Sequence, residues 1–281
     1  MTISETGQIS ASDGVVLQYR IHAAQSPRAS LLVIHGFAEH GARYGHLVDA
    51  LGPHGISVME WDQRGHGKSG GRRVFVESFD QYVADAELAI DLAVQKLPAP
   101  LFVVGHSMGG LVALLVARKK PAAVKGWILS NPALKNAVVI PAWKEALARG
   151  ASKLLPQLAV PSGIPPEHTS RDPAEVAAYA HDPLNSKSAT ARWYTEFVAA
   201  QADVCAHPEA LAGLKGLVLL GTGDLIIDHQ TTKALVGRIP NQNIELHSYD
   251  GFYHELFNEP EADRRTVFAD TVAWLQAQLA G

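Results

Sequence analysis

The chain of 281 residues is long enough for one large domain or a domain with an insertion, and its formal net charge is −4, with 24 lysine and arginine against 28 aspartate and glutamate side chains. This mild charge argues against nucleic acid as a main partner, no apolar run approaches the roughly 20 residues of a membrane-spanning helix, and a single cysteine, Cys205, excludes an internal disulfide. The polar N-terminus has no hydrophobic signal region, so we expect a soluble cytoplasmic protein.

Short apolar runs alternate with longer helical patterns along most of the chain. The first element is a predicted hairpin over 8–21, around the turn pair Asp13-Gly14. Strands are then predicted at 30–34, 56–61, 101–104, 127–130, 217–220 and 244–249. Helices are predicted at 44–51, 79–97, 111–119, 230–238 and from 260 to 279. Several of the strands are bare apolar runs, which is typical of parallel strands buried on both faces. The alternation predicts an α/β fold, doubly wound, with a mostly parallel sheet and helices on both faces.

The alternation breaks between Leu134 and His207, where seven prolines occur and no strand is predicted. A stretch of this length is too long for a plain loop, so we expect inserted helical material. The predicted organisation is a core formed by 1–134 and 208–281, with a helical cap over 135–207.

Within the predicted cap, residues 142–155 have the pattern of an amphipathic helix. Its apolar stripe consists of Trp143, Leu147, Gly150 and Leu154. Two interpretations are open. The stripe packs on the core, or the helix is a lid that covers an apolar substrate or touches a lipid surface.

The stretch 101–117 is the most informative one, because an apolar run ends in Gly105-His106-Ser107-Met108-Gly109 and a helical pattern starts at once. This is the pattern of a nucleophile elbow, a strained strand-to-helix turn that exposes its serine at a helix N-terminus. A tight turn without chemistry is the alternative. A second Gly-x-Ser-x-Gly match surrounds Ser69, but it follows a polar stretch and no helix starts after it. We therefore interpret Ser69 as a loop residue.

A serine nucleophile needs a base, and the base needs a third group to hold its tautomer. Asp224 follows the predicted strand 217–220, and His254 follows the strand 244–249. Both come after carboxyl ends of strands, where open α/β sheets place their sites. The weaker candidates are Asp228, which fits a helix N-cap, Asp250, which fits a turn, and the histidines His106, His229 and His247.

Two backbone N–H groups should stabilise the oxyanion. We expect one from Met108, directly after the nucleophile, and one from Phe37, in the loop after the strand 30–34. Alternatively, Gly36 only permits a turn in that loop.

The chain resembles the monoacylglycerol lipase and lysophospholipase branch of the α/β-hydrolase superfamily, and the resemblance covers nearly the whole sequence. The motifs that carry it are His35-Gly36-Phe37-Ala38-Glu39-His40 with Arg43-Tyr44, the stretch 62–71, Gly105 to Gly110, Ser170-Arg171-Asp172-Pro173, and Tyr253 to Glu259. One departure is Ala38, where the family commonly has glycine.

The resemblance implies an α/β-hydrolase fold with a helical cap and a serine esterase that needs no metal or cofactor. Carried onto matching positions, it implies Ser107 as nucleophile, Asp224 as acid, His254 as base, and Phe37 and Met108 as oxyanion donors. The implied reaction cleaves monoacylglycerols to a fatty acid and glycerol. A broad carboxylesterase, a lysophospholipase or a thioesterase is the alternative, and a catalytically silent receptor is an alternative from another class. The expected partner is a small lipid ester. A further interpretation is that the cap makes transient contact with a lipid surface and that the protein is located at the periphery of a membrane.

Overall fold

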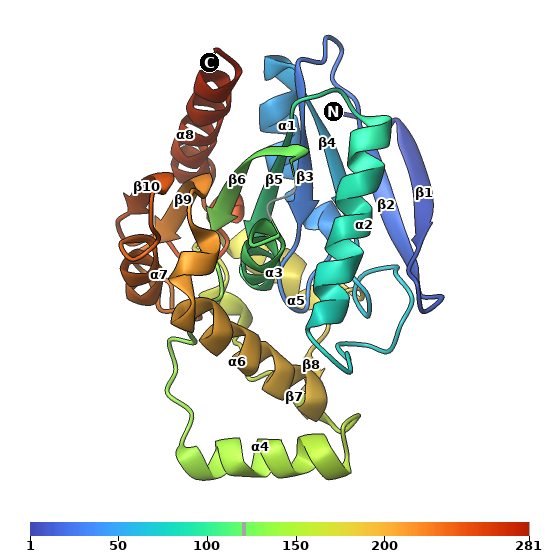
Figure 1. The fold of residues 1–281 in the computed structure, drawn as a ribbon, viewed down its shortest axis with the longest axis vertical. Coiled ribbons are helices and arrows are strands. Elements are labelled where there is room, and N and C mark those ends of the chain that lie inside the picture. Colours follow the sequence, from blue (N-terminus) through green and yellow to red (C-terminus); the bar gives the residue numbers. More distant parts are fainter. Residues whose placement is uncertain (120–121, 281) are drawn as a thin grey trace.

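The computed structural model describes residues 1–119 and 122–280, and a sheet of eight strands forms its centre (Figure 1). The strands, in spatial order, are β1 (Glu5–Ser10), β2 (Val16–His22), β4 (Ile56–Trp61), β3 (Ala29–Ile34), β5 (Leu101–His106), β6 (Val124–Ser130), β9 (Lys215–Gly221) and β10 (Asn243–Tyr249). β2 pairs antiparallel with β1 and β4, and the other neighbours pair in parallel. The predicted mostly parallel sheet is therefore confirmed.

Helices cover both faces of this sheet. Residues of β3 alternate between two apolar cores: Leu31 and Val33 pack with α1 (Gly45–Leu51) and α8 (Glu261–Ala280), whereas Leu32 and Ile34 pack with the helices of the other face. That face carries α2 (Asp80–Lys96), α3 (Met108–Ala117) and α7 (His229–Val236). Short 3-10 helices lie at Gly41–Tyr44, Gly52–His54, Pro166–His168, Pro208–Leu211 and Leu256–Asn258. A strand buried on both faces has no polar side, which explains the bare apolar runs.

The strand order places a switch point beside β3. From β3 the chain first adds β4 on one side and then crosses to add β5 on the other side. At such a point the loops after the two neighbouring strands leave in different directions and open a crevice at the carboxyl edge of the sheet. The loops after β3 and β5 are the ones that carry Phe37 and Ser107.

The segment 135–207, called the insert below, lies between β6 and β9. It contains α4 (Ala142–Leu154), α5 (Pro173–His181) and α6 (Ala191–Ala206). It also contains an antiparallel pair of three-residue strands, β7 (Ala159–Pro161) and β8 (Ser188–Thr190). The prediction of no strand in this region was wrong. Strands this short cannot establish an alternating pattern, and β7 is exposed and ends in proline.

α4 lies across one end of the molecule, beside α6 (Figure 1). Its apolar stripe faces away from the core: Trp143 is 61% exposed, Leu147 64% and Leu154 83%. The interpretation that this stripe packs on the core was therefore wrong. Another side of α4 faces α6, where Ser152 bonds the Thr195 hydroxyl over 2.7 Å. No described helix is both long enough and apolar enough to cross a bilayer.

Candidate active site

Ser107 lies between β5 and α3 with φ 51° and ψ −119°, a backbone conformation that residues other than glycine rarely adopt. The turn is held by backbone hydrogen bonds: the Ser107 N–H donates to Ser130 O, and Ser107 O accepts from the N–H groups of Gly110 and Ala133. Together these hydrogen bonds hold the backbone of Ser107 in its strained conformation. α3 begins directly after Ser107, three residues earlier than predicted.

The two glycines of the predicted elbow are required by close packing. A Cβ on Gly105 would overlap the carbonyl group of Gly109. A Cβ on Gly109 would overlap the Ile34 carbonyl oxygen of the neighbouring strand. Glycine is unfavourable within a helix, so the close approach of the backbones explains why it occurs at the start of α3.

Asp224 and His254 are in contact, as the interpretation as acid and base requires. The His254 Nδ1–H donates to Asp224 Oδ2 over 2.7 Å. The other carboxylate oxygen, Oδ1, accepts from the N–H groups of Ile226 (2.8 Å) and Ile227 (3.0 Å), which fixes the carboxylate plane. Burial lowers the pKa of His254, but the charge of Asp224 and the hydrogen bond to it raise it more. The pKa therefore lies above its usual value.

Ser107 and His254 line the same cavity. The Ser107 hydroxyl forms no hydrogen bond within residues 1–119 and 122–280, so its link to His254 is open in this structure. Catalytic hydrogen bonds are often long before substrate binds. With Nδ1 engaged by Asp224, Nε2 is the nitrogen left to act on the serine.

The rival acids and the second serine have structural contacts. Asp228 caps α7 by accepting from the Gln230 N–H over 3.0 Å. Asp250 lies in a turn and accepts from the Thr222 hydroxyl. Ser69 lies in a loop, where its hydroxyl accepts from the Gln18 N–H and donates to the Asp62 carbonyl oxygen. The predicted roles of these residues as cap, turn and loop residues are confirmed.

The rival histidines also have other partners. His106 Nδ1 donates to Ser130 O over 3.1 Å, and burial followed by the nearby His254 holds the pKa of His106 well below its usual value. His247 in β10 bonds Asp270 and Glu245. His229 opens α7, where its ring accepts from the Gln230 side chain.

The loop after β3 passes directly against the nucleophile turn. A Cβ on Gly36 would lie 2.9 Å from Glu39 Oε1 and 3.2 Å from Ser107 Cβ, so close approach of these groups favours glycine here. Phe37 follows, and Met108 is the first residue of α3, where a helix leaves its N–H groups without partners. Ala38 has φ 63°, in the left-handed region that favours glycine. This conformation explains why glycine is common at that position in the family that the chain resembles.

Three buried charged residues beside the cavity were not predicted. Glu39 accepts from the Gly36 N–H over 2.5 Å, and Arg43 bridges Glu39 (3.3 Å) and Glu255 (2.5 Å). Burial and then the charge of Glu255 raise the pKa of Glu39. All three lie in motifs that carry the resemblance. Their position as charged residues beside the predicted catalytic loops was the feature of the sequence that could have identified them.

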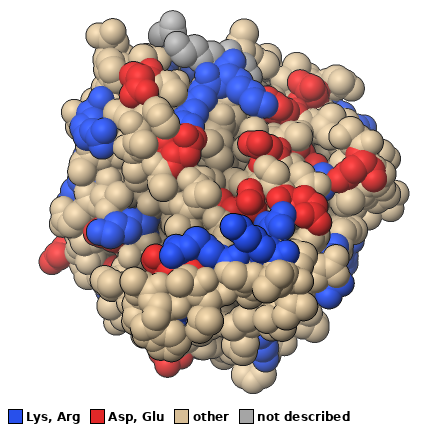
Figure 2. Space-filling view, turned by 60° about the horizontal axis from the view of Figure 1, so that its bottom comes forward, with Lys and Arg blue, Asp and Glu red and all other residues tan. Residues whose placement is uncertain are grey.

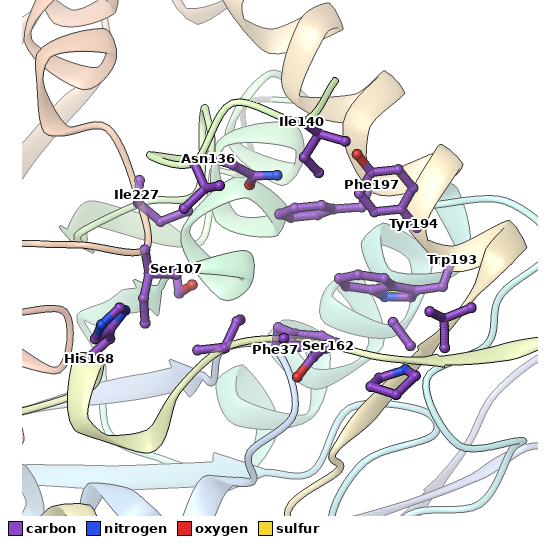
Figure 3. Close-up of a pocket in the computed structure, with 18 of the residues that line it drawn as sticks. Phe37, Ser107, Asn136, Ile140, Ser162, His168, Trp193, Tyr194, Phe197 and Ile227 are labelled. Atoms are coloured by element: carbon purple, nitrogen blue, oxygen red, sulfur yellow. The ribbon is translucent and has the colours of Figure 1, made fainter. Parts of the chain in front are cut away.

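The cavity has a volume of about 820 Å³, within the range of sites for small molecules. Trp193, Tyr194 and Phe197 project into it from α6, on the side across from Ser107, with Ile140 above and Phe37 below (Figure 3). Phe37 packs on Trp193, which stacks on Phe197. The lining away from Ser107 is therefore mainly apolar, and the polar side chains within it include Asn136, Lys144, Ser162 and Thr190.

Comparisons with known proteins agree with this geometry. The family model described as serine aminopeptidase, S33, matches residues 25–261. A monoacylglycerol lipase of Mycolicibacterium smegmatis is 32% identical over 95% of each chain. Phospholipase YtpA of Bacillus subtilis is 30% identical over 87% of this chain and 94% of its own. The crystal structure of Paleococcus ferrophilus monoacylglycerol lipase superposes with a TM-score of 0.82 at 29% identity, over 93% of this chain and 99% of that one. The expected α/β-hydrolase fold is confirmed.

Proposed function

The chain belongs to the serine aminopeptidase S33 family of α/β-hydrolases, in its monoacylglycerol lipase branch, and we propose that it hydrolyses monoacylglycerols to a fatty acid and glycerol. The observation that carries this proposal is the position of Ser107 and the His254–Asp224 pair at one end of an apolar cavity. A carboxylic ester needs the polar groups at its carbonyl, and a single acyl chain needs the apolar remainder.

In the proposed mechanism, Ser107 Oγ attacks the ester carbonyl carbon while His254 Nε2 takes the hydroxyl proton. The Phe37 and Met108 N–H groups stabilise the oxyanion, and Asp224 stabilises the imidazolium. When the C–O bond breaks, His254 returns the proton to the departing glycerol oxygen. Water then attacks the acyl-enzyme, gives a proton to His254 and releases the fatty acid, and the proton returns to Ser107.

A phospholipid-derived monoacyl ester is the second candidate. It is favoured by the sequence identity to the Bacillus subtilis phospholipase (30%), which is almost as high as the identity to the Mycolicibacterium smegmatis monoacylglycerol lipase (32%). Both substrates would place one acyl chain in the cavity and differ in the group that leaves. A broad carboxylesterase or thioesterase would share the mechanism. The contact of Asp224 with His254 speaks against a silent receptor, which has no use for an aligned base.

Release of fatty acid from mono-, di- and triacylglycerol and from a lysophospholipid, at equal acyl-chain length, tests the proposal. We expect kcat/KM for monoacylglycerol to exceed that for di- and triacylglycerol by about 100-fold or more, because one cavity holds one chain. A higher value for the lysophospholipid would favour the second candidate. Turnover of short generic esters with little release from any lipid would contradict both.

We further propose that the insert forms a cap over the site and that α4 touches lipid surfaces through its exposed stripe. Leu147 of the stripe and the neighbouring Ala151 also line the cavity, so the stripe extends from the cavity to the outer surface. Lys144, Glu145, Arg149 and Lys153 lie away from the centre of the stripe, and Glu145 pairs with Arg149 over 3.7 Å, which leaves the helix with a net positive charge. Figure 2 shows this end of the molecule, where a largely uncharged area is bordered by a band of Lys and Arg. Apolar side chains flanked by cations favour binding at an anionic interface.

The combined change of Trp143, Leu147 and Leu154 to serine should weaken binding to vesicles of anionic phospholipid by about tenfold or more, the equivalent of roughly 1.4 kcal/mol. Cosedimentation with the vesicles measures the partition coefficient. Val94→Ser removes another exposed aliphatic side chain (48% exposed), on α2, and should leave binding unchanged. Equal partitioning of wild type and the triple variant would contradict surface contact through α4.

A further inference from the structure

Residues 169–171 of the insert lie against the loop that carries His254. The Glu255 N–H donates to the Thr169 carbonyl oxygen over 2.7 Å. The Ser170 hydroxyl donates to the Asn258 carbonyl oxygen, also over 2.7 Å. The insert therefore contacts the main chain immediately after the proposed base and again four residues beyond it.

Arg171 adds charged contacts between the insert and the core. Its Nε lies 2.9 Å from Glu259 Oε2 and its Nη2 2.7 Å from Asp263 Oδ2. The guanidinium carbon lies 4.5 Å from the centre of the Phe252 ring. One side chain of the insert thus spans residues on both sides of His254 in the sequence.

Glu259 links Arg171 to the backbone of Tyr253, the residue before the proposed base. Its side chain is fully buried, and its second oxygen, Oε1, accepts from the Tyr253 N–H. Asn131 of the core also donates to the carbonyl oxygens of Tyr253 (3.1 Å) and His254 (2.8 Å). The backbone at the base is therefore held by both Asn131 and Glu259.

We propose that Arg171 is a positioning residue for His254, which it holds in place by neutralising Glu259 and so fixing the Tyr253 peptide. The proposal rests on the proposed function, in which His254 is the base. A buried carboxylate without a partner is strongly unfavourable, so loss of Arg171 would let Glu259 rotate or take up a proton. Arg171 is outside the set of described residues that line the catalytic cavity, so its effect on the reaction must pass through other residues.

Arg171→Met should lower kcat by about 10- to 100-fold, since a displacement of a catalytic group by about 1 Å has an effect of this size. KM should change by less than about threefold, because the wall of the cavity keeps its side chains. A soluble short-chain ester such as p-nitrophenyl butyrate is the substrate, so that lipid binding has no influence. Thermal unfolding of each variant shows whether the chain is folded.

The pH profile separates positioning from a general loss of structure. The charged or titratable groups that face His254 are Asp224, His106, Glu255 and Glu39. A base displaced from Asp224 loses the interaction that raises its pKa. The acid limb of kcat/KM should therefore move to lower pH in Arg171→Met. Partial unfolding alone would lower the amplitude and leave the limb in place.

Two further variants test the route through Glu259. In Arg171→Met/Glu259→Gln the amide oxygen still accepts from the Tyr253 N–H and needs no counter-charge, so kcat should recover by about tenfold over Arg171→Met. Arg171→Lys keeps the charge but not the planar fork, so it should retain an intermediate rate, and it carries the test if the methionine variant does not fold. Arg118→Met is the matched control, because it breaks another pair between the core and the insert, with Asp203 of α6. It should keep kcat within about twofold.

A folded Arg171→Met enzyme with wild-type kcat and pH profile would overturn the proposal, and a double variant as slow as Arg171→Met would overturn the route through Glu259. Labelling with a fluorophosphonate distinguishes failure of the proposed function. Wild type that is not labelled at Ser107 would overturn both the function and the positioning role. Wild type labelled at Ser107, with Arg171→Met labelled equally fast, would overturn the positioning role alone.

Discussion

Ser107→Ala is expected to lower kcat for ester hydrolysis by on the order of 10⁴- to 10⁶-fold, the range found for serine nucleophiles elsewhere. Only the attacking oxygen is removed. The bonds that hold the turn come from the Ser107 backbone, and the hydroxyl makes none within the described residues, so the unfolding temperature should stay within a few degrees of wild type. Hydrolysis of p-nitrophenyl butyrate and labelling with a fluorophosphonate measure the loss.

Ser69→Ala is the matched control for this variant, because Ser69 has the same Gly-x-Ser-x-Gly spacing. Its hydroxyl bonds Gln18 and Asp62, so its removal should cost about 1 kcal/mol of stability while labelling persists. Retained turnover in Ser107→Ala would show that Ser107 is not the nucleophile.

Asp224→Asn is expected to reduce kcat by about 10⁴-fold, as replacement of the triad acid does in serine proteases. The neighbouring backbone N–H groups explain this loss. The N–H groups of Ile226 and Ile227 donate to Oδ1, so an asparagine must place its oxygen there and its NH₂ group toward His254 Nδ1. The imidazole then carries its proton on Nε2 and cannot accept one from Ser107. Steady-state kinetics over a range of pH should show the loss at every pH.

Asp228→Asn separates the two candidate acids. It removes the charge that caps α7 and pairs with Lys135 but leaves the contact between Asp224 and His254 untouched, so we expect less than about threefold change in kcat. A larger loss in Asp228→Asn than in Asp224→Asn would show that the acid is misassigned.

The central fold was predictable because its physical signal is local. β4 begins and ends where the sequence predicts, because its buried residues are mostly apolar, although Ser57 and Glu60 interrupt the run. The pair of short strands in the insert has no such signal. The period of α4 predicts a helix and its apolar stripe, but a period does not say which way the stripe faces. In the structure the stripe is exposed, and Ser152 on another side of the helix bonds Thr195 of α6.

The site divides in the same way. Chain order and the ends of strands predicted that Asp224 would meet His254, 30 residues later. Spacing alone does not separate Asp224 from Asp228, because both follow β9; the structure does, because Asp228 caps α7 and Asp224 contacts His254. The pairing of Arg171 with Glu259, 88 residues apart, could not be predicted from spacing, because it depends on how the insert folds back on the core.

The insert leaves the sheet after β6 and returns at β9, and these two strands are direct neighbours. Because the two strands are parallel, the chain leaves at the carboxyl end of β6 and re-enters at the amino end of β9. The ends of the insert nevertheless lie close together, since Cys205 Sγ contacts the Leu134 carbonyl oxygen over 3.7 Å. For protein engineering, two parts of the proposed cap differ in their expected consequences. Exchange of the part around α4 would alter which molecules enter, whereas residues 169–171 would have to be retained if Arg171 aligns His254 as proposed.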